Sequence, residues 1–223
     1  MSPHLHVFYG GTFDPVHDGH LAVARNARDA LSASVHLMPA ADPPHKGPTQ
    51  ADAMQRASML ELAVAGEHGL VVDIRELRRE GPSYTIDTLH DIRAELGDDI
   101  PIALLLGADS FRGLPSWKSW RELFLHAHFV VAEREGHHVE DLLPQELAVS
   151  VAHRWTASAN ELQQIAAGRV FKLEQPLRPE SASAIRHRIA NGEPWREGVP
   201  PSVAEFIIQS GLYIKPAITS ASL

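Results

Sequence analysis

The stretch of sequence that decides the fold is Gly10-Gly11-Thr12-Phe13-Asp14-Pro15-Val16-His17-Asp18-Gly19-His20, which directly follows the apolar run Leu5–Tyr9. This order is typical of a strand, a tight loop and the first turn of a helix. Adjacent glycines let backbone N–H groups approach a ligand closely, and the positive end of the following helix favours an anion. His17 and His20 are three residues apart, so both imidazoles lie on one face of the helix start. The stretch therefore predicts a site for the phosphates of a nucleotide.

Short apolar runs alternate with segments of helical spacing along the chain. The runs that predict buried strands are Leu5–Tyr9, Val35–Pro39, Leu70–Ile74, Ile102–Leu106 and Phe129–Ala132, with a weaker sixth at Val170–Leu173. The segments that predict helices are Leu21–Leu31, Ala53–Ala65, Thr85–Leu96, Trp117–Leu125 and Asp141–Val149. This rhythm predicts an α/β protein with a doubly wound, Rossmann-like parallel sheet.

The loops that follow the strands are expected to meet at one edge of this sheet, where such folds bind ligands. These loops are Gly10–His20, Ala40–Gln50, Gly107–Ser116 and Glu133–His138. After Pro179 the pattern changes to two helices, about Ala182–Ala190 and Val203–Gln209. We therefore expect residues 1–179 to form the core and residues 180–223 to form a C-terminal helical extension of the same domain.

Composition restricts the class of protein. The 223 residues are 44% hydrophobic, which suits one domain with a substantial core. A net charge of −8 opposes a main role in binding nucleic acid or an anionic membrane. The absence of cysteine excludes disulfides, a thiolate nucleophile and a cysteine-based zinc site. With neither a signal peptide nor a long apolar run in the sequence, we expect a cytoplasmic protein; nothing in the sequence indicates its oligomeric state.

The stretch from Gly10 to His20 resembles the signature of the nucleotidyltransferase superfamily that carries an H-x-G-H motif. Further matches occur in the order found in bacterial nicotinate-nucleotide adenylyltransferases: Pro43-Pro44-His45-Lys46, Pro82-Ser83-Tyr84-Thr85 with Asp87-Thr88-Leu89, Leu106-Gly107-Ala108-Asp109-Ser110, and Ser181-x-Ser183-x-x-Arg186. The resemblance extends from Val7 to Tyr213, and it departs from the family at Glu180, where an aliphatic residue is usual, and at Ser183, where Thr is commoner. It implies an enzyme of NAD biosynthesis that makes deamido-NAD and pyrophosphate from ATP and nicotinate mononucleotide.

Adenylyl transfer needs positioning and charge stabilisation more than covalent chemistry. The acceptor phosphate is already an anion near neutral pH, so no dedicated general base is needed. The candidates for neutralising the developing charge, and thus the expected catalytic residues, are His17, His20, Lys46 and Arg186. We expect Mg²⁺ to be carried by the ATP phosphates and water, with no metal ligands among the site residues.

The two substrates are expected to use different residues. The expected ATP-binding residues are Gly10, Gly11, Thr12, Phe13, His17, His20, Lys46, Arg134, Ser181, Ser183 and Arg186. Within this set, Ser181 and Ser183 begin a helix, where hydroxyls and N–H groups suit the outer phosphates. The resemblance implies that Tyr84, Thr85 and Trp117 form the pyridine pocket. The expected residues for nicotinate mononucleotide are Tyr84, Thr85, Gly107, Asp109 and Trp117.

Simpler roles compete with these assignments. His17 and His20 could ligate a metal, although no third ligand has matching spacing, or they could simply cap a helix, with Asp18 the likelier capping residue. Asp109 could cap a helix at Ser110–Gly113, and Trp120 is a better core candidate than Trp117. Histidines without a matched motif are expected to be surface or structural; these are His126, His128, His137, His138 and His153.

Other functions remain open from the residues alone. The acceptor could be nicotinamide mononucleotide or phosphopantetheine, and the chain could be a non-catalytic nucleotide-binding module. Class I aminoacyl-tRNA synthetases share a similar histidine pair, but a lysine-rich K-M-S-K-S-like loop is missing here. An NAD-dependent oxidoreductase is disfavoured, because Gly10-Gly11 lacks G-x-G-x-x-G spacing. We expect the proline-rich loop Ala40–Gln50 to be mobile when the site is empty.

Overall fold

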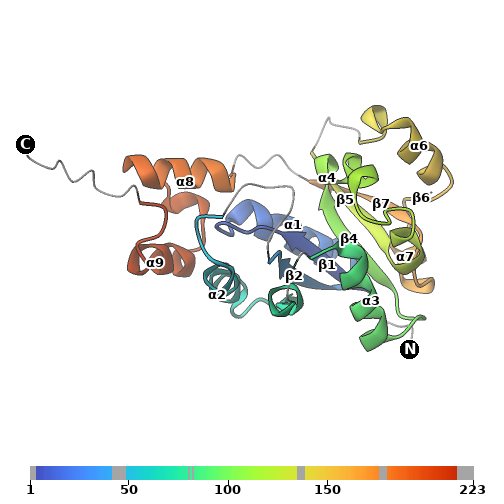
Figure 1. Cartoon of the computed structure of the whole chain (residues 1–223), viewed down its shortest axis with the longest axis horizontal. Helices are drawn as coiled ribbons and strands as arrows, with labels where there is room; N and C mark the ends of the chain where they lie inside the picture. The colour runs from blue at the N-terminus through green and yellow to red at the C-terminus, as the bar shows by residue number, and fades with distance from the viewer. Residues whose placement is uncertain are drawn as a thin grey trace, which may run out of the picture.

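The architecture comes from a computed structural model that describes residues 4–41, 49–79, 81, 83–134, 139–175 and 180–214. Its strands are β1 (His6–Gly11), β2 (Ser34–Pro39), β3 (Leu70–Val72), β4 (Ile102–Gly107), β5 (His128–Arg134), β6 (Trp155–Thr156) and β7 (Val170–Gln175). They form one parallel sheet of seven strands in the order β3-β2-β1-β4-β5-β7-β6 (Figure 1). The predicted α/β class and Rossmann-like parallel sheet are confirmed.

The strand order reverses between β1 and β4. The chain moves outward from β1 through β2 to β3, returns to the other side of β1 as β4, and continues outward through β5. The loops that leave β1 and β4 therefore turn away from each other, and in such sheets the crevice that binds ligands lies between these loops, at the carboxyl end. Tyr9 pairs with Leu105 across these strands, so the glycines that end both strands lie at the same level.

Helices cover both faces of the sheet. One face carries α1 (Asp18–Leu31), α2 (Ala53–Val64), α7 (Ala159–Gln164), α8 (Ala182–Asn191) and α9 (Pro201–Gln209). The other face carries α3 (Thr85–Leu96), α4 (Ala108–Arg112), α5 (Leu123–His126) and α6 (Gln145–Val151). Figure 1 shows α8 and α9 together at one end of the molecule, beside α1 and α2.

The two faces follow from alternation along each strand. In β1, Val7 points into the core under α1 while Phe8 points into the core under α3. In β4, Leu105 points into the core under α1 and Leu104 into the core under α3. Successive side chains of these strands are all buried because helices pack on each face of the sheet, which is why the strands appear in the sequence as continuous apolar runs.

Sequence and structure differ most at the predicted helix Trp117–Leu125, which is wrong for most of its length. Ser119 has a φ of 51°, in the left-handed region, which breaks any helix there, and α5 begins only at Leu123. Strand β6 was not predicted, because it is too brief to show a period, and α4 begins two residues before the helix at Ser110–Gly113 that the sequence offered as an alternative. In the predicted helix Asp141–Val149, Pro144 separates a 3₁₀ turn (Val139–Leu142) from α6.

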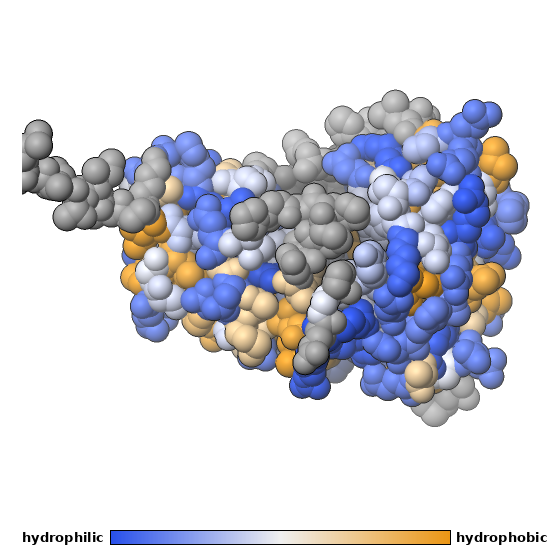
Figure 2. Space-filling model, in the orientation of Figure 1, coloured by the Kyte–Doolittle hydropathy of each residue, from blue (hydrophilic) through white to orange (hydrophobic). Residues whose placement is uncertain are grey.

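The exposed surface is mostly polar. Figure 2 shows a largely hydrophilic face, with hydrophobic areas at the end that carries α9 and smaller ones at the opposite end. Within the described part of the chain, no helix is long and apolar enough to cross a membrane.

A half-buried histidine, His36, and a buried one, His128, lie in the two halves of the sheet. The His36 ring stacks on Phe8 and its Nε2 lies 3.1 Å from Nδ1 of His6. His128 is fully buried: its Nε2 lies 2.9 Å from the carbonyl oxygen of Ile165, and its Nδ1 accepts a hydrogen bond from the backbone N–H of Arg169. Burial lowers the pKa of both His36 and His128 to about 4.

These depressed pKa values predict acid destabilisation. Between pH 6.5 and pH 4, these histidines are protonated in the unfolded chain but remain neutral in the folded chain. The free energy of unfolding therefore falls as the pH falls through this window. Each such histidine contributes a slope of up to about 1.4 kcal/mol per pH unit. Urea titrations of His36→Asn should show a shallower decline than the parent chain. Equal slopes in the two proteins would contradict this prediction.

Candidate active site

The two histidines of the H-x-G-H stretch cap helix α1 reciprocally. The Nδ1 atom of His17 accepts the backbone N–H of His20 at 3.3 Å, and Nδ1 of His20 accepts the backbone N–H of His17 at 3.3 Å. Imidazoles thus do what a Ser and a Glu do in the usual capping box. Of the alternative that this stretch caps a helix, capping by the histidines is confirmed, whereas Asp18 as the likelier capping residue is wrong, because Asp18 is already the first helical residue and His17 holds the cap position.

The capping bonds also determine where the imidazole protons reside. A neutral imidazole that accepts through Nδ1 must carry its proton on Nε2. The two rings stack with centroids 3.7 Å apart, so their Nε2 edges are presented together. Burial lowers the pKa of His17 to about 4, against a smaller opposing effect of Glu180. At neutral pH His17 is therefore an uncharged N–H donor.

Two glycines are required by the rings around them. A Cβ at Gly19 would lie 3.0 Å from the His17 ring, so a side chain there would displace that imidazole. A Cβ at Gly11 would lie 2.8 Å from the Phe13 ring. Phe13 is buried, has a φ of 51° and meets the His20 ring edge-on at 4.9 Å. The Phe13 ring thus packs against both the start of this loop, at Gly11, and the His20 ring.

Asp14 joins this loop to distant parts of the chain. Its carboxylate, 4% exposed, accepts the backbone N–H groups of Gln50 and Ala51 at 3.0 and 3.2 Å and the Tyr213 hydroxyl at 2.7 Å. Burial, with the Asp14 carboxylate alongside, raises the pKa of Tyr213. This role is not predicted from the sequence, since an Asp beside a Pro in a loop shows no sign of burial.

Helix α8 reaches the same loop through Arg186. Its Nη1 donates to the Asp14 carbonyl oxygen at 2.6 Å and its Nη2 donates to the Ser183 hydroxyl at 3.4 Å. Ser181 caps α8 and accepts the backbone N–H of Ala184 at 3.2 Å. The predicted phosphate-binding residues of α8 are therefore next to the start of α1, although more than 160 residues separate them in the sequence.

A buried guanidinium holds the first two strand-to-helix loops together. Arg56 is fully buried and donates to the carbonyl oxygens of Thr12 and Ala40, both at 2.8 Å, and of Ala41 at 3.1 Å. The burial of Arg56 was not predicted, although its position in the sequence indicates it. Arg56 shares one helical face with the buried residues Met59, Leu60 and Ala63 of α2. A charged residue in an apolar stripe indicates a specific buried partner.

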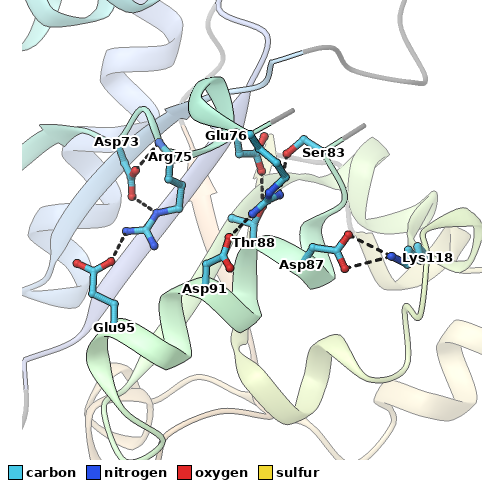
Figure 3. A network of polar contacts seen from close by, with 10 residues as sticks. Asp73, Arg75, Glu76, Ser83, Asp87, Thr88, Asp91, Glu95 and Lys118 are labelled. Carbon is cyan, nitrogen blue, oxygen red and sulfur yellow. Dashed lines mark hydrogen bonds and ion pairs between the residues drawn. The ribbon is translucent and has the colours of Figure 1, made fainter. Parts of the chain in front are cut away.

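Tyr84 and Thr85 lie at the start of helix α3, in a well-anchored segment. Arg79 donates to the hydroxyls of Ser83 at 3.1 Å and Thr88 at 2.9 Å, and Thr88 in turn donates to the buried Glu76 (Figure 3). Thr85 is the first helical residue, and no side chain of the described residues caps this helix. Its first-turn N–H groups are thus available to an anion.

A lysine connects the Tyr84 segment to the Trp117 segment. The ammonium of Lys118 binds both carboxylate oxygens of Asp87 at 3.1 Å (Figure 3) and lies 4.7 Å from the centre of the Tyr84 ring. Trp117, next to it, is half-buried, whereas Trp120 is 6% exposed and belongs to the core. The interpretation of Trp120 as the core tryptophan is confirmed.

Gly107 and Asp109 lie where β4 ends, on the far side of the crevice from Gly11. Gly107 is the cap residue of α4, so the alternative of Asp109 as a helix cap is wrong. The Asp109 carboxylate is almost fully exposed and pairs with Arg112 one turn later. Two predicted residues, Lys46 and the side chain of Arg134, lie outside the part of the chain that the structure describes, as does most of the loop expected to be mobile.

Comparisons with known proteins agree with this geometry. The cytidylyltransferase-like family model matches residues 8–188. A probable nicotinate-nucleotide adenylyltransferase of Stenotrophomonas maltophilia is 50% identical, over 95% of this chain and 98% of that protein. One of Marinobacter nauticus is 45% identical, over 94% and 96%. The structure of Plasmodium falciparum nicotinic acid mononucleotide adenylyltransferase complexed with NaAD has a TM-score of 0.70 at 16% identity, covering 94% of this chain and 97% of that one; at this identity the likeness shows the fold alone.

The buried guanidinium generates a stability prediction. Arg56→Met leaves three loop carbonyls without their donor, and each unsatisfied buried acceptor costs about 1–3 kcal/mol. We expect the free energy of unfolding in urea to fall by roughly 3 kcal/mol, allowing for water that reaches the outer carbonyls. Arg25→Met, which removes a partly exposed ion pair with Glu67, should cost less than about 1 kcal/mol. Similar losses in the two variants would contradict a specific role for Arg56.

Proposed function

The chain belongs to the nicotinate-nucleotide adenylyltransferases of the cytidylyltransferase-like family, and from that premise we propose that it transfers the adenylyl group of ATP to nicotinate mononucleotide. The products are deamido-NAD and pyrophosphate, as in NAD biosynthesis. The observation that carries this proposal is the reciprocally capped histidine pair at the sheet's switch point, in a chain 45–50% identical to such relatives over nearly its whole length.

The reaction is one in-line displacement. An oxygen of the acceptor's 5′-phosphate forms a bond to the α-phosphorus of ATP, and the bond from that phosphorus to the oxygen bridging the β-phosphate breaks. The electron pair leaves with pyrophosphate. The attacking phosphate is already ionised, so the protein's task is to align two anions and stabilise the charge that develops on the α-phosphate oxygens.

His17 and His20 are suited to that stabilisation by two features. The Nδ1 atoms of both rings are engaged in the capping bonds, so the neutral His17 ring carries its proton on Nε2 as a donor, and the N-terminus of α1 adds its positive dipole. ATP enters as its Mg²⁺ complex. The buried Asp14 carboxylate is occupied by two amides and a hydroxyl, which supports Mg²⁺ being carried by the phosphates and water.

The outer phosphates of ATP fit the start of α8. Ser181 and Ser183 are exposed there, and Arg186, fixed to the Asp14 carbonyl, places a permanent positive charge beside them. We assign Lys46 to the same phosphates, and Arg134 to the adenosine, from the family resemblance. This arrangement makes residues 180–214 part of the reaction site, which supports one domain with a C-terminal extension.

The acceptor fits the start of α3. The uncapped first-turn N–H groups and the Thr85 hydroxyl suit the carboxylate of nicotinate, while Tyr84 and Trp117 offer aromatic faces to its ring. Gly107 leaves open space at the end of β4, since a Cβ there would meet nothing within 4 Å. The exposed Asp109 carboxylate beside it suits the ribose hydroxyls.

Pyrophosphate release measures the reaction directly. We expect the chain with Mg²⁺, ATP and nicotinate mononucleotide to release pyrophosphate, and His20→Ala to lower kcat by about 10²–10³-fold, the usual cost of one lost transition-state donor. His187→Ala, at an exposed position on α8, should retain the parental rate. ATP binding without turnover of any acceptor would instead indicate a non-catalytic nucleotide-binding module.

Acceptor choice tests the α3 assignment separately. We expect kcat/KM for nicotinate mononucleotide to exceed that for nicotinamide mononucleotide. The first-turn N–H groups of α3 stabilise an anion, and only the nicotinate ring carries an anionic carboxylate. Thr85→Val should lower kcat/KM for the nicotinate substrate by about tenfold or more, the value of a hydrogen bond to a charged group, and should affect the amide less. Thr156→Val, in the edge strand β6, is the matched control. Equal losses for both acceptors would overturn the assignment.

A further inference from the structure

Two histidines and a glutamate meet on the surface between α3 and α5. Nε2 of His90 lies 3.3 Å from Oε1 of Glu122, and Nε2 of His126 lies 3.7 Å from the same oxygen. The two imidazoles meet edge to face with centroids 4.8 Å apart. In the described ranges this is the one set of three such side chains whose donor atoms all lie within 4.8 Å of one another.

The spacing fits a tetrahedral metal ion. Zinc binds histidine nitrogen and carboxylate oxygen at about 2.0–2.2 Å, so two ligands at a tetrahedral angle are about 3.4 Å apart. The distances from the Glu122 oxygen to the two Nε2 atoms, 3.3 and 3.7 Å, lie on either side of this value. A set of two imidazoles and one carboxylate is also a donor combination that zinc favours, with water as the fourth ligand.

The backbone that carries these ligands is already fixed. Arg93, one turn after His90 on α3, is buried and donates from Nε and Nη2 to the carbonyl oxygen of His126, at 3.0 and 2.6 Å. Glu122 and His126 are one helical turn apart. The three side chains are thus held near each other by two hydrogen bonds that involve none of their donor atoms, so a metal ion has little backbone ordering to impose.

The cluster is accessible to an ion from solvent. The side chains of His90, Glu122 and His126 are 50%, 42% and 24% exposed. An ion pair between exposed groups contributes little by itself, which leaves these ligands available. The cluster is separate from the histidine pair of α1, because it joins two segments on the opposite face of the sheet.

We propose that His90, Glu122 and His126 form a zinc site that clamps α3 to the segment after Trp117. The ion binds the two Nε2 atoms and one carboxylate oxygen, releases any imidazole protons, and keeps one water ligand. It adds a second tie between the segments that Lys118 and Asp87 already join. This inference stands independently of the adenylyl transfer reaction.

Isothermal titration of the untagged, EDTA-treated full chain with zinc chloride tests the site. We expect one zinc ion per chain, and binding weakened roughly tenfold or more in His90→Ala, Glu122→Gln and His126→Ala. His153→Ala, an exposed histidine after α6, should bind as the parent does. Cobalt(II) in place of zinc should give the visible absorption of a tetrahedral ion in the parent and not in His90→Ala.

Thermal unfolding supplies a second readout and shows that the variants are folded. Without metal, all four variants should unfold cooperatively at temperatures close to the parent. Zinc should raise the Tm of the parent and of His153→Ala but not that of His90→Ala, since an ion that binds only the folded chain stabilises it by mass action. Absence of binding at zinc concentrations up to about 1 mM, or equal binding by the parent and the three ligand variants, would overturn the proposal.

Discussion

The buried carboxylate of Asp14 is the interaction on which the arrangement of the site depends. A buried carboxylate is costly unless hydrogen bonds compensate for the lost water, and here the donors come from far along the chain. The amides of Gln50 and Ala51 bring in the start of α2, and Tyr213 brings in the end of the C-terminal segment. Arg186 completes the set on the backbone carbonyl of the same residue. Satisfying one charge therefore assembles one side of the crevice from three distant pieces of sequence.

Helix capping and the phosphate chemistry that we propose use the same two imidazoles. Each ring uses Nδ1 to complete the start of α1, which fixes its orientation and leaves the proton on Nε2. The stack of His17 on His20 also explains why Gly19 separates them, since a Cβ at that position would push the ring away. A motif that would otherwise be regarded as purely catalytic is thus also a structural cap, and mutation of either histidine removes both roles at once.

Much of the fold could be predicted because parallel strands buried on both faces leave continuous apolar runs in the sequence. All six predicted strands are present. The predicted helix at Trp117–Leu125 is wrong because Ser119 adopts a left-handed conformation, and the local sequence pattern does not indicate that conformation. Arg56 and Asp14 were missed for a related reason: their partners are backbone groups of other loops, and a sequence does not show which carbonyls or amides lie nearby.

By itself, the sequence determined the class of fold and the kind of chemistry, because both depend on local order: apolar period along each strand, and the glycines and histidines of one eleven-residue turn. The tertiary structure decided how those residues act. It placed α8 beside α1 and buried His17, so that this imidazole is a neutral donor at pH 7. It also brought His90 to His126, which share no motif. Protonation and metal-binding geometry depend on neighbours in space, and distances between remote residues exist only once the chain is folded.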